Sequence, residues 1–176
     1  MASGADRVRG RRTGRRLALA AVFEADFGQR TADAVLERHL AEEERDPMAA
    51  SLARDLVAAE MAHRHEIDAE IARLAPRYPV TALARMDRAL LRCAISEVLH
   101  SATPARVAIA EWVELARTYS GEPMRRLMNG VLGNIAAETS GTRPTAPAPN
   151  SEEGVSGNNV RTPQEDRRRA ARRRRG

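Results

Sequence analysis

The segment from Leu83 to Leu99 is apolar on nearly every face of a helix, and this feature constrains the fold of the chain most strongly. Its apolar residues are Leu83, Met86, Leu90, Leu91, Cys93, Ala94, Ile95, Val98 and Leu99. A helix that is hydrophobic all round has to be covered on every side by other elements. We therefore expect it at the centre of a helical bundle. Its charged residues should emerge at its ends or at an interface: Asp87, Arg88, Arg92 and Glu97.

The remainder of the chain from residue 11 to about 138 also has helical periodicity, with abundant Ala, Leu, Arg and Glu and little β-branched alternation. The sequence therefore predicts an all-α fold. We expect helices over residues 11–27, 32–45, 48–75, 83–99, 104–119 and 123–137. Thr31 and Thr103 are candidate N-caps, and Pro47 and Pro104 are candidates for the first helical position.

Two local features are expected within these helices. His63-Arg64-His65 marks a bend or an exposed turn in the third helix. Gly130 and Gly133 lie in the last helix, where the apolar spacing continues through them. We therefore expect these two glycines to allow close contact with a neighbouring helix.

Positive charge is concentrated at the two ends of the sequence. Residues 1–16 carry six arginines and one aspartate, and residues 161–176 carry eight arginines and two acidic residues. The segment between them has 15 arginines and 21 acidic residues. This distribution predicts capture of a polyanion, most often nucleic acid, by local basic surfaces. We divide the chain into a basic arm (1–10), a helical domain (11–138) and a disordered tail with a basic cluster (139–176), because the tail composition cannot bury a core.

The first helix is expected to separate charged from apolar residues. Arg11 and Arg15 are four residues apart, as are Arg12 and Arg16, so their guanidinium groups should gather on one side. Another side carries Leu19, Val22, Phe23 and Phe27. A folded helix would hold the arginines at fixed spacing against phosphates, which a free tail does not do.

Catalysis is not expected, since the sequence has no Gly-rich phosphate loop, nucleophile elbow or pair of catalytic carboxylates on a strand-to-helix turn. His63 and His65 suggest a metal site, but residues two apart face different sides of a helix and no third ligand follows at a matching spacing. We therefore expect neither a metal nor a cofactor. The five aromatic residues are too few for the base-stacking surface of an RRM-type or OB-type RNA binder.

The sequence favours a cytoplasmic protein. The single cysteine, Cys93, cannot form an intramolecular disulfide and lies in an apolar run, as expected in a reducing compartment. The apolar run after Arg16 is too short for a secretory signal and is interrupted by Glu24 and Asp26. We also expect no membrane span.

Three segments in the second half resemble the NusB transcription antitermination family. They are MDRALLRCAISEVLH, TPARVAIAEWVELARTYSGEP and MNGVLGNIA, in the family's order and at similar spacing, and the resemblance covers about residues 9–138. It implies an all-α fold of about seven helices arranged as two three-helix sub-bundles. The same module occurs in front of RNA cytosine methyltransferases, but no methyltransferase domain follows here, so we do not expect the fused enzyme.

The resemblance also implies a non-enzymatic RNA-binding function. Members of the family bind the boxA element of ribosomal-operon RNA together with the ribosomal protein NusE, and the complex acts on RNA polymerase to oppose termination. By the family pattern, Phe23 and Asp87 match positions that meet NusE. The matching arginine-rich start contains Arg11, Arg12 and Arg15, with Arg9 and Arg16 as additions.

One segment, at the start of the last expected helix, departs from the family pattern. Where the family usually has an acidic residue and an aromatic residue, this chain has Pro123 and Leu127, and it adds Arg125 and Arg126 as candidate phosphate contacts. This change affects the choice of RNA sequence more than RNA binding itself. Two alternatives therefore stay open: a protein-interaction module of the same fold without selective RNA recognition, and a nonspecific nucleic-acid condenser driven by the arginine tails.

Overall fold

The computed structural model describes residues 3–42 and 46–141, and its regular elements are six α-helices and one 3-10 turn. The elements are α1 (Gly4–Ala25), α2 (Ala32–Glu42), α3 (Pro47–Leu74), η1 (Val80–Ala82), α4 (Arg85–His100), α5 (Ala105–Tyr119) and α6 (Glu122–Thr139). The all-α prediction is confirmed. None of the helices described has the length and apolar character needed to cross a membrane. The predicted basic cluster near the C-terminus lies outside the described residues.

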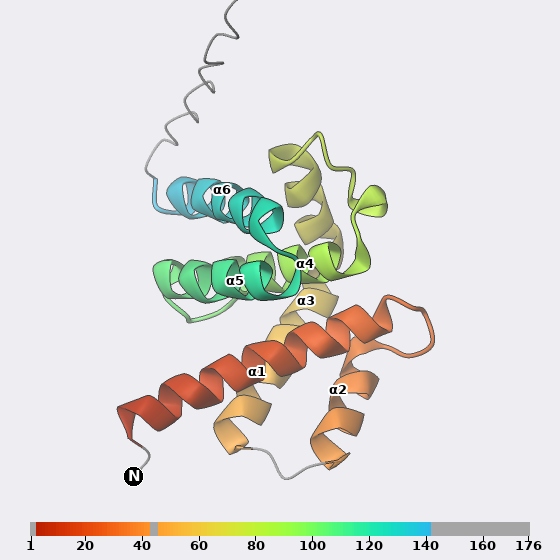
Figure 1. Ribbon diagram of the computed structural model, residues 1–176, viewed down its shortest axis with the longest axis vertical. Coiled ribbons are helices and arrows are strands. Elements are labelled where there is room, and N and C mark those ends of the chain that lie inside the picture. The colour runs from red at the N-terminus through yellow and green to blue at the C-terminus, as the bar shows by residue number, and fades with distance from the viewer. Residues whose placement is uncertain (1–2, 43–45, 142–176) are drawn as a thin grey trace, which may run out of the picture. The chain divides into compact units, whose positions relative to one another are not determined.

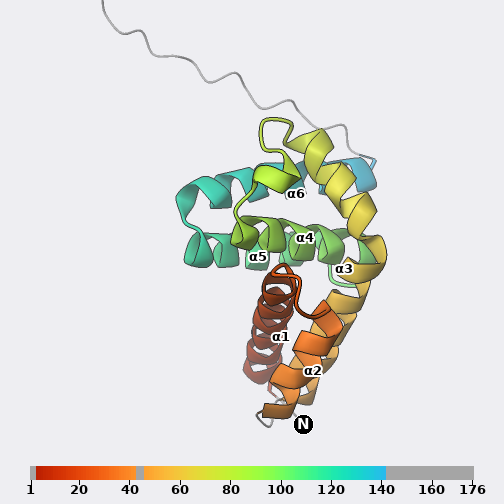
Figure 2. The same ribbon diagram turned by 90° about the vertical axis from the view of Figure 1, so that its right-hand side faces the viewer.

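The helices form two groups of three (Figures 1 and 2). In the first group α1 packs along α3, and α2 closes the bundle against both. In the second group α4, α5 and α6 pack against one another. The second half of the long α3 also packs on α4, and α1 meets α4 as well, so α4 lies where the two groups join. This arrangement agrees with the two three-helix sub-bundles that the family resemblance implies, with six α-helices and one 3-10 turn among the described residues where about seven helices were expected.

The apolar segment that constrained the fold prediction is the buried centre of the molecule. Leu90, Leu91 and Ile95 of α4 have no exposed surface. Trp112 of α5 and Met128 of α6 are equally buried and belong to the same core. Full burial of a Leu or Ile side chain is worth about 1.5–3 kcal/mol, so α4 contributes a large share of the stability of the fold.

The first helix begins at Gly4 and not at Arg11, so the segment predicted as a basic arm is largely helical. A capping box explains the early start. The Ser3 hydroxyl accepts a hydrogen bond from the Asp6 amide, and the Asp6 carboxylate accepts one from the Ser3 amide. These bonds satisfy amide groups that a helix N-terminus otherwise leaves without partners.

The expected bend at His63 is wrong, because α3 is continuous α-helix from Pro47 to Leu74. Buried Ile67 and Ile71 continue the apolar stripe beyond the histidines, so packing favours an unbroken helix there. The predicted start at Pro47 is correct, and the preceding Asp46 accepts a hydrogen bond from the backbone amide of Met48.

Close helix contact depends on glycines other than those predicted. A Cβ atom at Gly130 or Gly133 would have no atom within 4 Å, so the expectation for these two positions is wrong. At Gly14 of α1, a Cβ atom would lie 2.8 Å from the backbone oxygen of Ala49 in α3. At Gly10 it would overlap the Asp46 carboxylate. Gly10 and Gly14 therefore permit the close approach of α1 to α3.

Candidate nucleic-acid interface

The arginines of α1 point in three directions and do not form the single group expected. Arg15 faces inward and is 1% exposed. Arg11 is exposed and lies beside the start of α3 and the end of α4, where it lines a groove of about 800 Å³. Arg9, Arg12 and Arg16 are exposed on another side and line a shared groove of about 520 Å³.

Arg15 is not available to bind RNA, which corrects the prediction made for it. Its Nε and Nη2 atoms donate hydrogen bonds to the two carboxylate oxygens of Glu97, at 2.8 and 2.6 Å. Glu97 is fully buried and also accepts a bond of 2.6 Å from the indole nitrogen of Trp112. Arg15 therefore joins α1 to α4, and Glu97 joins α4 to α5. A guanidinium group enclosed in this way cannot reach a phosphate.

Arg12 connects α1 to α5 at the surface. Its Nε and Nη2 atoms donate to the carboxylate of Glu111 at 3.0–3.2 Å, while its side chain stays 59% exposed. A surface pair of this kind contributes little to stability and can be exchanged for a stronger anion. Arg11 and Arg16 form no ion pair with any acidic residue among residues 3–42 and 46–141.

The charged surface continues from α5 to α6. Arg117 pairs with Glu114 on α5, and Arg125 pairs with Glu122 at the start of α6. The hydrogen bond from Arg117 lowers the pKa of the Glu114 carboxyl, burial opposes this slightly, and the charges of Arg117, Arg12 and Arg125 lower it further. Guanidinium groups from three helices thus lower the pKa of this one carboxyl group.

The structure therefore brings two predicted groups of arginines to one surface. Figure 1 shows α5 lying between α1 and α6. We define the arginine surface by its members on these helices: Arg9, Arg12, Arg16, Arg117, Arg125 and Arg126. Of the two arginines on α6, Arg126 is the more exposed, with 75% of its side chain accessible to solvent. Arg117 was not predicted, and its role is visible only once α5 and α6 are placed together.

An apolar groove of about 280 Å³ adjoins this surface. We call it the aromatic groove, and its apolar lining is Leu19, Ala20, Phe23, Phe27, Met86 and Tyr119. Phe23 and Phe27 meet edge to face with centroids 5.4 Å apart, and Arg85 stacks on Phe27 at 4.5 Å. Phe27 is 52% exposed and Tyr119 is 45% exposed, which is unusual for such large apolar side chains.

Both predicted partner-binding residues lie at this groove or next to it. Phe23 is half-buried in its wall, and Asp87 follows Met86 and accepts a hydrogen bond from the Ser120 hydroxyl. Arg16 lines both the aromatic groove and the groove shared with Arg9 and Arg12. The aromatic groove and the arginine surface are therefore continuous.

Sequence reasoning missed two contributors to the aromatic groove and one basic group. Phe27 was detectable, because it follows Phe23 by four residues in a segment predicted to be helical, although it lies in the turn just after the end of α1. Tyr119 and Arg85 come from other helices, and no spacing along the chain links them to Phe23. Leu127 lies in the first half of α6, where it is half-buried and packs against the core.

Comparison with known proteins identifies the same family along most of the chain. The model of the NusB family matches residues 12–137. The transcription antitermination protein NusB of Symbiobacterium thermophilum is 39% identical over 134 residues, covering 71% of this chain and 88% of that protein. A solved structure of T. maritima NusB is 31% identical, has a TM-score of 0.67, and is matched over 73% of this chain and 91% of its own.

A further structure contains the antitermination factors NusB and NusE in complex with double-stranded RNA. It matches with a TM-score of 0.65 at 24% identity, over 74% of this chain and 98% of its own. At this identity the match supports the fold alone. The helical architecture is thus shared with a chain that was crystallised together with both a protein and an RNA.

Proposed function

Because the chain belongs to the NusB family, whose relatives are non-enzymatic transcription antitermination proteins, we propose that it is an RNA-binding adaptor in antitermination. Its RNA is boxA-like single-stranded RNA of ribosomal operons, and its protein partner is the NusE homologue. The assembled complex acts on the RNA polymerase elongation complex in the cytoplasm and modulates termination.

The arginine surface carries this proposal. It extends over α1, α5 and α6, and its guanidinium groups are exposed or held in exchangeable surface pairs. Arginine forks bind phosphates through paired hydrogen bonds, so a surface of this kind holds an RNA backbone in a defined orientation. Arg11 extends basic character to a second side of α1.

The aromatic groove is proposed as the NusE site. A groove with exposed Phe27 and Tyr119 offers the apolar centre that a protein interface needs, and Arg85 and Asp87 provide charged groups at its edge. Since Arg16 belongs to the groove and to the arginine surface, partner and RNA would meet along α1. This adjacency supports cooperative binding.

A salt-dependence measurement tests the role of the arginine surface. Each phosphate contact on single-stranded RNA contributes about 0.7 to the slope of log affinity against log salt. Changing Arg12 and Arg16 to Ala should therefore weaken RNA binding and flatten the slope by about 1–1.5 units. Fluorescence anisotropy with labelled RNA at several salt concentrations provides the slope.

The matched control changes Arg54 and Arg73 to Ala. Both are surface arginines bonded to glutamates, Glu37 for Arg54 and Glu70 for Arg73, and neither belongs to the arginine surface. This control removes the same charge but should leave the slope nearly unchanged. An equal loss in both double variants, or no loss in either, would remove the arginine surface from the RNA interface.

A second candidate function is a protein-interaction module of the same fold without selective RNA recognition. One observation favours it: Arg125 is bonded to Glu122 through two nitrogens, at 2.6–2.9 Å, and Leu127 packs on the core. The start of α6, where the sequence departs from the family, thus offers few free groups for reading bases. Equal binding of boxA-like and scrambled RNA in the presence of the partner would favour this candidate.

A further inference from the structure

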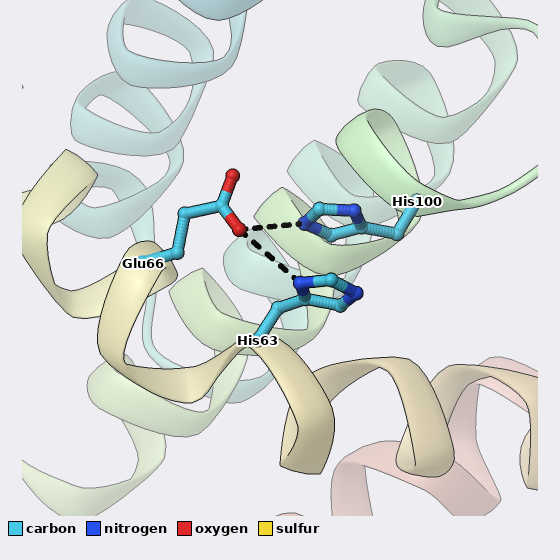
Figure 3. A group of neighbouring side chains, drawn as sticks. All are labelled: His63, Glu66 and His100. Atoms are coloured by element: carbon cyan, nitrogen blue, oxygen red, sulfur yellow. Dashed lines mark hydrogen bonds and ion pairs between the residues drawn. The ribbon is translucent and has the colours of Figure 1, made fainter.

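Three side chains that are distant in the sequence converge at the junction of α3 and α4 (Figure 3). His63 and Glu66 lie one turn apart on α3, and His100 is the last residue of α4. His63 Nδ1 is 3.2 Å and His100 Nε2 is 3.8 Å from the same Glu66 carboxylate oxygen. The two imidazole rings stack with centroids 3.7 Å apart and planes within 7°. One nitrogen of each ring therefore lies close to the same carboxylate oxygen.

The Nε2 atom of His100 lacks a hydrogen-bond partner among the described residues. This atom is also buried. The distance of 3.8 Å to Glu66 is too long for a hydrogen bond. A buried polar atom of this kind usually has a partner, which here has to come from outside the described side chains.

The donor atoms are those that borderline divalent ions prefer. Zinc binds His nitrogen at about 2.0–2.1 Å and carboxylate oxygen at about 2.0–2.2 Å. Ligand atoms around a tetrahedral zinc ion then lie roughly 3.4 Å apart, by the geometry of such bonds. The candidate atoms all lie within 4.8 Å of one another, so small side-chain rotations bring them into range. The rings also have to tilt from parallel, which the broad χ2 preference of histidine allows.

The surroundings are compatible with a cation. The Glu66 side chain is 57% exposed and that of His63 is 41% exposed, so the ion has an entry path and room for water as a fourth ligand. The neighbouring Arg64 is bonded to the buried Glu60 carboxylate through both its Nε and its Nη2, at 2.9 Å each. Its charge is therefore compensated within α3.

From this geometry we propose that His63, Glu66 and His100 form a site for one divalent transition-metal ion, with zinc as the expected ion and water completing its coordination. The site includes no residue of the arginine surface or of the aromatic groove, and His100 also lines the groove that contains Arg11. Its ligands come from the middle of α3 and the end of α4, so the bound ion cross-links the two helices at the junction of the two bundles. Because the ion binds the folded state, it stabilises that state by an amount that grows with the logarithm of the free-metal concentration above the dissociation constant.

The test uses the tag-free full chain after treatment with a chelator. Co2+ is the spectroscopic probe, because a low-symmetry site of nitrogen and oxygen ligands gives it visible absorption. We expect one equivalent of Co2+ to develop this absorption, Zn2+ to displace it, and Zn2+ to raise the melting temperature. His63→Ala and His100→Ala should each lose the absorption and the zinc-dependent rise.

His65→Ala is the matched control, since His65 is exposed on the same helix but lies outside the cluster. It should bind the ion as the unchanged chain does. Glu66→Gln keeps the shape of an exposed residue and should weaken binding without affecting the fold. The proposal is overturned if Co2+ gives no specific absorption in the folded chain, if Glu66→Gln and both His→Ala variants bind as tightly as the original, or if His65→Ala loses binding equally.

Discussion

Arg15→Ala is the substitution whose effect the structure defines most sharply. The Glu97 carboxylate has no exposed surface, and after the substitution the Trp112 indole is its remaining side-chain hydrogen-bond partner. Breaking a buried ion pair by removing one partner typically costs about 3–5 kcal/mol, because the other charge stays buried without compensation. Both side chains of this pair are at most 1% exposed, so solvent screening does not reduce the estimate.

Urea denaturation followed by far-UV circular dichroism measures this cost. A domain of this kind has a total stability of roughly 5–15 kcal/mol, so Arg15→Ala should remove a large fraction of it. A double variant, Arg15→Met with Glu97→Leu, removes both charges and retains apolar volume. It should recover much of the lost stability, because no uncompensated charge stays buried.

The opposite result would refute this account of Arg15. Suppose that Arg15→Ala costs less than about 1 kcal/mol, within the range of surface ion pairs, and flattens the salt dependence of RNA binding. Arg15 would then be a surface residue that contacts phosphate, as the sequence analysis predicted. The assignment of Arg15 and Glu97 to a buried ion pair would then be wrong.

Three further outcomes follow from the packing. Gly14→Ala should destabilise the fold by about 1–3 kcal/mol in urea denaturation, since its Cβ would press on the α3 backbone. Gly130→Ala should stabilise the fold by roughly 0.5–1 kcal/mol, because alanine favours the helix and its Cβ would meet no neighbouring atom. Equal effects of the two substitutions would contradict the assigned α1–α3 contact. Burial raises the pKa of the Cys93 thiol, with smaller contributions from nearby acidic groups, so a thiol reagent at pH 8 should label Cys93 only on unfolding; fast labelling of the folded chain would contradict its burial. Changing Phe27 and Tyr119 to Ala should weaken NusE binding, measured by calorimetry, while leaving RNA binding without NusE unchanged; intact NusE binding would exclude the aromatic groove as its site.

The sequence predicted the parts of the fold that depend on local pattern. The predominantly apolar run of α4 and the helix start at Pro47 each depend on residues within a few turns of one another, and both are confirmed by burial and by the helix bounds. The start of α5 was predicted one residue early, since the helix begins at Ala105 and its N-cap is Pro104 in place of Thr103. The glycine contacts were misassigned, because a glycine's sequence neighbours do not reveal which helix crosses it.

Arg15 and His100 show why the candidate sites were only partly predictable. Arg15 was predicted on the charged side of α1 because of its charge, although it precedes Ala18, Leu19 and Val22 by three, four and seven residues, a spacing that is typical of the buried face. What the spacing did not reveal was Glu97, the distant partner that makes this burial possible. His100 likewise meets His63 only through tertiary packing, so a search for ligands at short spacing did not find the cluster.

The most direct test of the account measures RNA affinity with and without the NusE homologue, using boxA-like RNA and a scrambled RNA of equal length. If RNA and partner meet along α1, the partner should raise boxA affinity by a factor corresponding to about 1–3 kcal/mol, and RNA should raise partner affinity by the same factor. Phe23→Ala with Asp87→Arg should abolish that gain without changing the binding of RNA alone. Independent binding of the two ligands, or an equal gain for scrambled RNA, would contradict the adaptor function.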